Sequence, residues 1–167
     1  MTDRFIDLEF SQARWLVFTS YLLALIVDTM MIMQQGSLLA PPFSLMLLMY
    51  WTAQFIKSTH FISAFILGLL MDAMLQTTLG AHSMMFIVLT FIMLRYRLLF
   101  RSHSVLQQAF VIAFYLLFYQ VLTFFLFSPT LQSGEFSLFW SMPLVGMVAW
   151  TIIALSLRWF TQKISLN

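Results

Sequence analysis

The charged residues divide this chain into long stretches that carry almost no charge. Its eight lysines and arginines are Arg4, Arg14, Lys57, Arg95, Arg97, Arg101, Arg158 and Lys163. The three long intervals between them, 15–56, 58–94 and 102–157, each contain a single acidic residue. The chain is 62% apolar and 8% charged, whereas soluble domains are about a quarter charged, so it lacks the polar side chains that cover a water-facing surface. The sequence therefore predicts a membrane protein.

Each of these intervals is long enough for two membrane crossings, because a crossing needs about 20 apolar residues. We expect one integral membrane domain over residues 1–167, an all-α bundle of six transmembrane helices. The predicted spans cover residues 15–33, 39–56, 61–76, 82–97, 105–127 and 138–157. Six crossings place every basic residue and both termini on one side of the membrane. The positive-inside rule assigns that side to the cytoplasm.

Motifs of soluble enzymes and metal proteins are absent from the sequence. It holds no G-x-x-x-x-G-K-[ST], H-E-x-x-H or G-x-S-x-G pattern and no cysteine. His60, His82 and His103 fall in three different turns, so we expect no metal site and no cofactor. A net charge of +2 is too small for binding nucleic acid. We therefore expect a protein that is not an enzyme and whose helices carry its function.

Two acidic residues fall inside predicted spans, Asp28 in the first and Asp72 in the third. A charged side chain near the centre of a bilayer costs about 2.5–3.5 kcal/mol on insertion scales, so each is expected to face protein or water. Three interpretations stay open. In the first, the two residues form a relay for protons or cations. In the second, each is a hydrogen-bonded side chain that holds helices, or a partner protein, together. In the third, which applies to Asp28 alone, the side chain lies close enough to the outer interface to be solvated. We favour the hydrogen-bonded role.

Small residues accompany Asp72 on one face of its helix. Ala64, Gly68 and Asp72 are spaced by four and share that face, where small side chains let another backbone approach closely. The approaching helix belongs either to this chain, which we favour, or to a partner protein. In both cases Asp72 is expected at a close contact between helices rather than in lipid.

The central segment carries a moderately specific pattern. In chain order it comprises Pro41-Pro42, Tyr50-Trp51, Gly68-x-x-x-Asp72, Thr78-Leu79-Gly80, Arg95-Tyr96-Arg97 and Phe100-Arg101. Together with the length, span count and topology, this pattern resembles MreD, a family of small membrane proteins in the bacterial rod-shape system. The chain departs from the family pattern at Lys57-Ser58, where a proline is expected, and at Ala64, where a glycine is expected.

The resemblance implies a non-catalytic scaffold of the cell-elongation machinery, embedded among the lipids of the bacterial inner membrane and supporting lateral peptidoglycan synthesis. It implies direct contact with MreC and association with MreB, RodA and the elongation-specific penicillin-binding protein. The helix-packing or partner interface is then expected at Ala64, Gly68, Asp72, Thr78 and Gly80. A fold of this kind is also similar to the substrate-binding subunit of vitamin importers.

That similarity supplies an alternative function, a subunit that binds a vitamin-like small molecule for a membrane transporter. The outer turns around Gln34, Thr77-Thr78 and Glu135 would close over the ligand, and Asp28 would contact it from the outer half. Such a subunit often docks its ATP-driven module through an Ala-x-x-x-Ala pattern on the first helix. The first predicted span offers only Ala24 as a small apolar residue, which favours the scaffold.

Overall fold

The computed structural model describes residues 10–33, 39–55, 59–128 and 135–165, and all of its regular structure in these ranges is helical. The six helices are α1 (Phe10–Met33), α2 (Phe43–Gln54), α3 (Phe61–Leu75), α4 (Ala81–Ser102), α5 (Val105–Phe127) and α6 (Glu135–Ser165). The predicted all-α fold with six helical segments is confirmed over the described residues. Four of the helices, α1, α4, α5 and α6, are long and apolar enough to cross a membrane.

The second helix is shorter than the sequence suggests. A crossing is predicted over 39–56, but α2 has only 12 residues and therefore a length of about 18 Å, against a hydrocarbon core of about 30 Å. Pro41 and Pro42 lie before the helix, and Phe55 is already extended at its end. Most of α2 is buried, so its apolar residues face other helices. It is an internal helix whose hydropathy reflects burial in protein.

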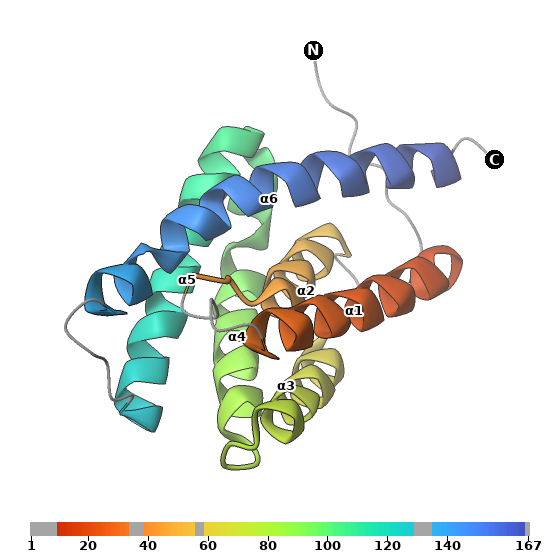
Figure 1. Cartoon of the computed structure of the whole chain (residues 1–167). Helices are drawn as coiled ribbons and strands as arrows, with labels where there is room; N and C mark the ends of the chain where they lie inside the picture. Colours follow the sequence, from red (N-terminus) through yellow and green to blue (C-terminus); the bar gives the residue numbers. More distant parts are fainter. Residues whose placement is uncertain (1–9, 34–38, 56–58, 129–134, 166–167) are drawn as a thin grey trace.

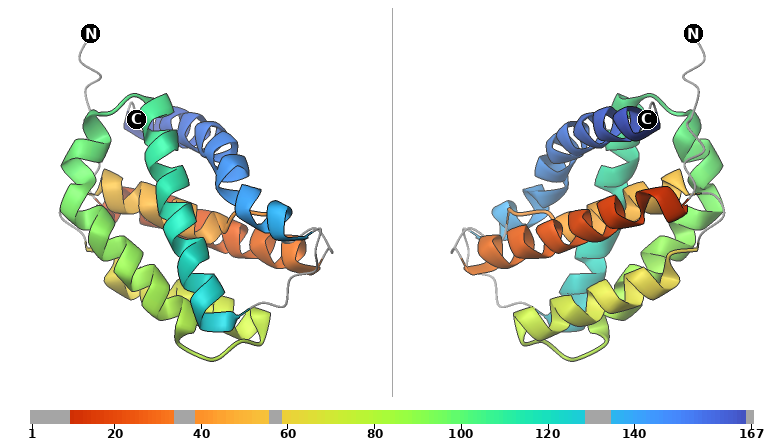
Figure 2. Two further views of the ribbon diagram at one scale, coloured as in Figure 1. Left: turned by 90° about the vertical axis from the view of Figure 1, so that its left-hand side faces the viewer. Right: turned by 90° about the vertical axis from the view of Figure 1, so that its right-hand side faces the viewer.

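The two turns that the structure describes throughout lie at opposite ends of the molecule. The start of α1, the end of α6 and the α4–α5 turn lie toward one end, and the α3–α4 turn lies at the other (Figures 1 and 2). The pairs α3–α4 and α5–α6 pack most extensively, and α2 contacts both α1 and α4. The α1 and α6 helices do not pack tightly on one another.

Aromatic and sulfur-containing side chains fill the interior around α2. Trp51 and Trp150 are fully buried, and Trp150 contacts the rings of Tyr50 and Phe100. The indole Nε1 of Trp51 donates to the Ser20 hydroxyl at 2.9 Å, so this polar atom is satisfied between α2 and α1. Several methionines complete the core: Met46, Met49, Met85 and Met93. Flexible thioether side chains suit such irregular interiors.

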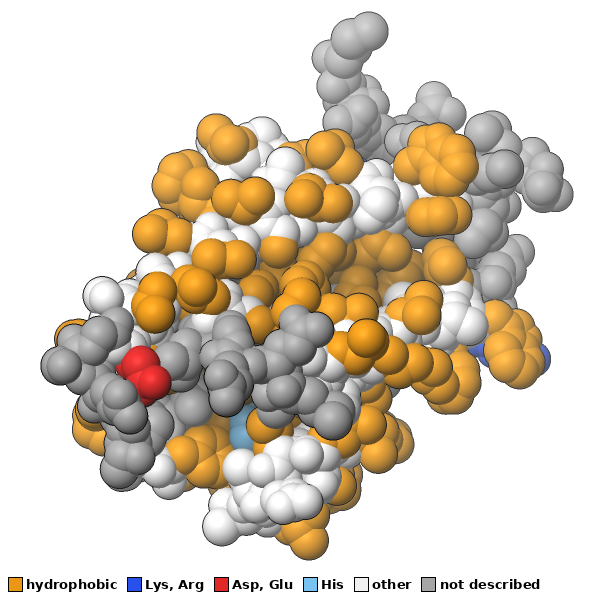
Figure 3. Space-filling view, viewed as in Figure 1, with side chains coloured by type: hydrophobic (Ala, Val, Ile, Leu, Met, Phe, Trp, Pro, Cys, Tyr) orange, Lys and Arg blue, Asp and Glu red, His pale blue; other side chains and the backbone are white. Residues whose placement is uncertain are grey.

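The outward faces of the long helices are apolar. Hydrophobic side chains dominate the face in Figure 3, and large ones such as Trp15, Phe91, Phe114 and Val148 are exposed. A soluble monomer rarely exposes apolar surface on this scale. These helices therefore fit lipid as their surroundings, which agrees with the sequence prediction of a membrane protein.

Candidate functional site

The carboxylate of Asp72 organises the turn between α3 and α4. Its Oδ1 accepts hydrogen bonds from the Thr77 hydroxyl at 3.0 Å, the His82 backbone N–H at 3.2 Å and the His82 ring Nδ1 at 2.6 Å. Its Oδ2 accepts from the Gly80 backbone N–H at 2.7 Å. Asp72 and His82 are both almost fully buried. This buried carboxylate is thus fully engaged with donors of its own chain.

The backbone conformation of the turn directs two N–H groups toward the Asp72 carboxylate. Gln76 ends α3 in the left-handed conformation with φ of 54°, and Gly80 precedes α4 with φ of +97°. Glycine adopts such a positive φ without the steric cost of a side chain. The N–H groups of Gly80 and His82 belong to the start of α4, where a helix has no internal acceptors for them. Asp72 therefore caps α4 from the preceding helix.

The small-residue face of α3 lies directly against α4. A Cβ atom on Gly68 would overlap the backbone of Ser83 and would lie 2.8 Å from the carbonyl carbon of His82. Ala64, one turn earlier, is fully buried. The structure therefore places both residues at a contact within this chain. Thr78 lies apart from them: its side chain is exposed, and its carbonyl accepts from the Ala81 N–H at 3.2 Å.

Asp28 caps the start of α2, as Asp72 caps the start of α4. Its Oδ1 accepts from the Phe43 N–H at 2.7 Å and its Oδ2 from the Ser44 N–H at 2.9 Å, and these are the first two residues of α2. The Asp28 side chain is only 3% exposed. This burial argues against a simply solvated residue, one of the interpretations left open by the sequence. The carboxyl lies where the start of α2 meets α1.

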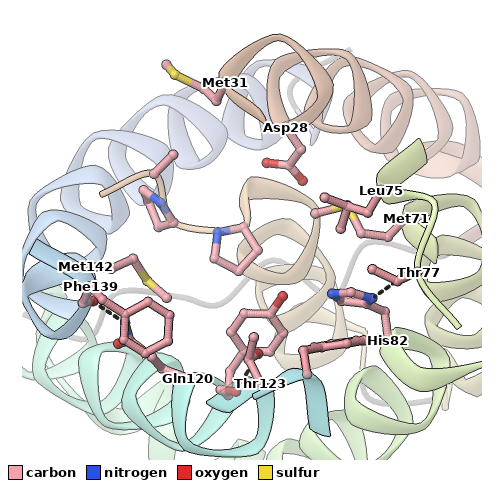
Figure 4. Close-up of a pocket in the computed structure, with 15 residues that line it drawn as sticks. Asp28, Met31, Met71, Leu75, Thr77, His82, Gln120, Thr123, Phe139 and Met142 are labelled. Atoms are coloured by element: carbon pink, nitrogen blue, oxygen red, sulfur yellow. Dashed lines mark hydrogen bonds between the residues drawn. The ribbon is translucent and has the colours of Figure 1, made fainter. Parts of the chain in front are cut away.

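A third contact of this kind joins α5 to α6, and sequence reasoning missed it. Pro143 lies inside α6 and has no N–H, so the carbonyl of Phe139 loses its usual helical partner. The side-chain Nε2 of Gln120 on α5 donates to that carbonyl (Figure 4). An unsatisfied carbonyl in a bilayer costs several kcal/mol, so this bond makes the proline tolerable. The available signal was the pairing of a glutamine in the middle of a long apolar run with a proline in the run that follows it.

These three contacts surround a cavity of about 250 Å³ (Figure 4). Its polar lining comes from Asp28, Thr77, His82, Tyr119, Gln120 and Thr123. Its apolar lining includes Pro41, Met71, Leu75, Phe127, Phe139 and Met142. The lining residues belong to α1, α3, α4, α5, α6 and the segment before α2, so the cavity lies where the starts of α2 and α4 approach the ends of α1 and α5. Of these residues, the sequence singled out Asp28, Thr77, Pro41 as part of the family pattern and, only as a turn residue, His82.

The histidines are not gathered at a metal site. Among the residues that the structure describes, no three His, Asp or Glu side chains could hold one metal ion together. His82 pairs with Asp72 and stacks on Phe127, with ring centroids 5.0 Å apart. His60 lies before α3 and is buried, and this burial lowers its pKa to about 4. Of the outer residues proposed for a transporter ligand, Glu135 does not line the cavity, and Gln34 lies outside the described residues.

Comparison with known proteins identifies the family. The family model described as rod shape-determining protein MreD matches residues 10–164, nearly the whole chain. No solved structure matches the chain, so the similarity to vitamin-importer subunits stays a prediction. The match includes all six helices, the Asp72 turn and the cavity. This helical membrane protein therefore belongs to the MreD family of rod shape-determining proteins.

Proposed function

We propose that this protein is a non-catalytic scaffold of the rod complex in the bacterial inner membrane, where it binds MreC through its helices. Through MreC it associates with MreB, RodA and the elongation-specific penicillin-binding protein and supports lateral peptidoglycan synthesis. The observation that carries the proposal is the use of the intramembrane polar groups. Asp28 and Asp72 bond the starts of α2 and α4, and Gln120 bonds a carbonyl within α6, while the outward faces offer apolar surface for another helix.

In the proposed topology the chain traverses the membrane six times in one domain, with both termini in the cytoplasm, and α2 is a short crossing enclosed by the other helices. It is supported by the placement of the start of α1, the end of α6 and the α4–α5 turn toward one end of the molecule (Figure 1). The chain has no cysteine, so single cysteines report accessibility without background. A cysteine at exposed Ser102 is expected to resist a membrane-impermeant thiol reagent in intact cells, and one at exposed Thr78 to react. The reverse pattern would contradict the topology.

The proposed seat for the MreC membrane helix is the hollow between α1 and α6. Figure 3 shows this hollow lined by hydrophobic side chains, and α1 and α6 do not close it by packing together. The face of Ala64, Gly68 and Asp72 is already occupied by α4, so we assign it to packing within the protein. Thr78 and Gly80 then shape the α3–α4 turn. The exposed side chain of Leu79, between them, offers MreC an apolar contact at the outer end of the protein.

Photo-crosslinking tests this seat directly. Crosslinking residues introduced at Leu22 and Ile26 on α1 and at Val148 and Ile152 on α6 are compared with one at Phe114 on α5, all of which are exposed in the isolated chain. Adducts with co-expressed MreC are expected from at least one position on each of α1 and α6. Adducts confined to the α5 position would place the partner elsewhere and contradict the proposed seat.

Affinity purification from gently solubilised membranes tests the function itself. Mass spectrometry is expected to find MreC and the wall-elongation enzymes at near-stoichiometric levels. Recovery of ATP-hydrolysing coupling subunits without wall enzymes would contradict the scaffold function. The comparisons do not favour this transport alternative, because the family match is to rod shape-determining proteins.

A further inference from the structure

The cavity lined by α1, α3, α4, α5 and α6 is more than a gap in packing, because three of its polar lining residues, Asp28, Gln120 and His82, offer hydrogen-bond acceptors. We propose that it binds a small organic cation, a primary ammonium or amidinium group attached to a compact apolar body. None of the residues named for the proposed partner seat, Leu22, Ile26, Val148 and Ile152, lines this cavity.

Three acceptors define the polar side of the site. The Asp28 carboxyl lines the cavity, and no basic side chain among the described residues forms an ion pair with it. The Oε1 of Gln120 is buried and has no hydrogen-bond partner in the described part of the chain, because only its Nε2 is used by Phe139. A buried acceptor without a donor costs about 1–3 kcal/mol, so a ligand N–H at this place is strongly favoured.

The third acceptor is a ring nitrogen of His82. Its Nδ1 lies 2.6 Å from Asp72 Oδ1 and therefore carries a proton, so in the neutral imidazole Nε2 is an acceptor. Figure 4 shows one ring nitrogen of His82 near Thr77 and the other directed toward the cavity. Asp28, Gln120 and His82 thus come from three different helices and offer lone pairs to one space. A ligand with several N–H donors matches them, whereas an anion does not.

The remaining lining sets the size and the apolar half of the ligand. The side chains of Met71, Leu75, Phe139 and Met142 form an apolar wall. The cavity volume of about 250 Å³ exceeds the engineered cavity of about 150 Å³ that holds benzene. It is smaller than the usual lower limit of about 300 Å³ for drug-sized ligands. A single ring or short branched chain with one charged arm therefore fits.

Binding of three matched probes tests the proposal on the unmodified protein. Benzylammonium, benzyl alcohol and benzoate share a ring and differ in the charge of the arm. Ligand-observed NMR with the protein in phosphatidylcholine nanodiscs measures each affinity, and empty nanodiscs correct for partition into lipid. Saturable binding of benzylammonium is expected, at least about tenfold tighter than either other probe, a difference that one charge-assisted hydrogen bond supplies. Equal affinities or no saturable binding would overturn the proposal.

Variants at Thr123 locate the binding. The Thr123 hydroxyl donates to the Tyr119 carbonyl of its own helix at 2.9 Å and, across to α4, only to the weak acceptor Met85 sulfur at 3.9 Å, so the fold depends little on it. Thr123→Phe fills the cavity and is expected to weaken benzylammonium binding at least about tenfold, whereas near-isosteric Thr123→Val changes it by less than about threefold. Leu126→Phe adds the same ring on the exposed side of α5 and controls for bulk. Unchanged binding to Thr123→Phe would place the probe outside the cavity and refute the site.

Discussion

Replacing Asp72 by leucine removes the acceptor for four donors of the α3–α4 turn. The Thr77 hydroxyl is only half-buried, and the His82 ring can change tautomer, so neither need remain unsatisfied. The backbone N–H groups of Gly80 and His82 have no such escape at the start of α4. At about 1–3 kcal/mol for each orphaned donor, the two together predict a loss of about 2–6 kcal/mol in the free energy of unfolding.

Asp28→Leu is the matched comparison, because it also removes a buried carboxyl that caps a helix. It orphans the N–H groups of Phe43 and Ser44, which match those of Gly80 and His82 in burial, but it lacks the two side-chain bonds that Thr77 and His82 make to Asp72. Its expected cost is therefore smaller than that of Asp72→Leu by about 1–2 kcal/mol, the contribution of those two bonds. The structure thus ranks the two residues by the number of their donors.

Asp72→Asn separates the charge from the geometry. An amide oxygen at Oδ1 keeps the bonds from Thr77 and His82, but an NH₂ group at Oδ2 faces the Gly80 N–H as a second donor. One satisfied donor becomes a repulsive pair, so the expected loss is about 1–3 kcal/mol, between those of the wild type and Asp72→Leu.

Equilibrium unfolding in mixed detergent micelles, followed by tryptophan fluorescence, measures all three variants, because Trp51 and Trp150 are buried in the fold. In cells, Asp72→Leu is expected to impair rod shape more than Asp28→Leu at matched protein levels. A loss for Asp72→Leu below about 1 kcal/mol would refute the capping argument. Wild-type cell shape for both variants would refute the ranking.

Three further changes test the helix contacts. Gly68→Ala is expected to destabilise the protein by about 1–3 kcal/mol in the same unfolding assay, although alanine favours helices, because its Cβ meets the α4 backbone. Gly80→Ala is expected to lower stability by about 1–2 kcal/mol through its positive φ alone, since nothing lies near the added Cβ; an unchanged midpoint would exclude this strain. Gln120→Leu is expected to cost about 1–3 kcal/mol, and adding Pro143→Ala is expected to recover much of it by restoring an N–H for the Phe139 carbonyl; additive losses would contradict that pairing.

The positions of the helices follow closely from the sequence wherever a polar turn interrupts an apolar run. The predicted span 105–127 coincides with α5, whose start is fixed by a reciprocal cap between Ser104 and Gln107. The prediction was poorest for α2, because apolar composition alone does not distinguish a helix buried in protein from one that crosses lipid. The prolines before it mark the true start, but hydropathy extends the apolar run across them.

The partners of the intramembrane polar residues were harder to predict for a different reason. Asp28 and Asp72 bond mainly backbone N–H groups, which every residue except proline possesses and which therefore leave no pattern in the sequence. The spacing from each aspartate to its target also differs, since the segment between α1 and α2 is longer than the α3–α4 turn. The cavity depends on the same contacts, so its outline could not be predicted either.

The hydrogen-bonding type of Asp28, Asp72 and Gln120 nevertheless matches the unpaired backbone group in the helix that follows each of them. The starts of α2 and α4 present unpaired N–H groups, and the residues that meet them, Asp28 and Asp72, are acceptors. In α6 the unpaired group is a carbonyl exposed by Pro143, and the residue that meets it, Gln120, is a donor. Water cannot satisfy these groups within a bilayer, so the preceding helix of each hairpin supplies the partner. Asp28 and Gln120 also line the cavity, where the Oε1 of Gln120 has no hydrogen-bond partner among the described residues, so these structural contacts also contribute to a site suited to a cation.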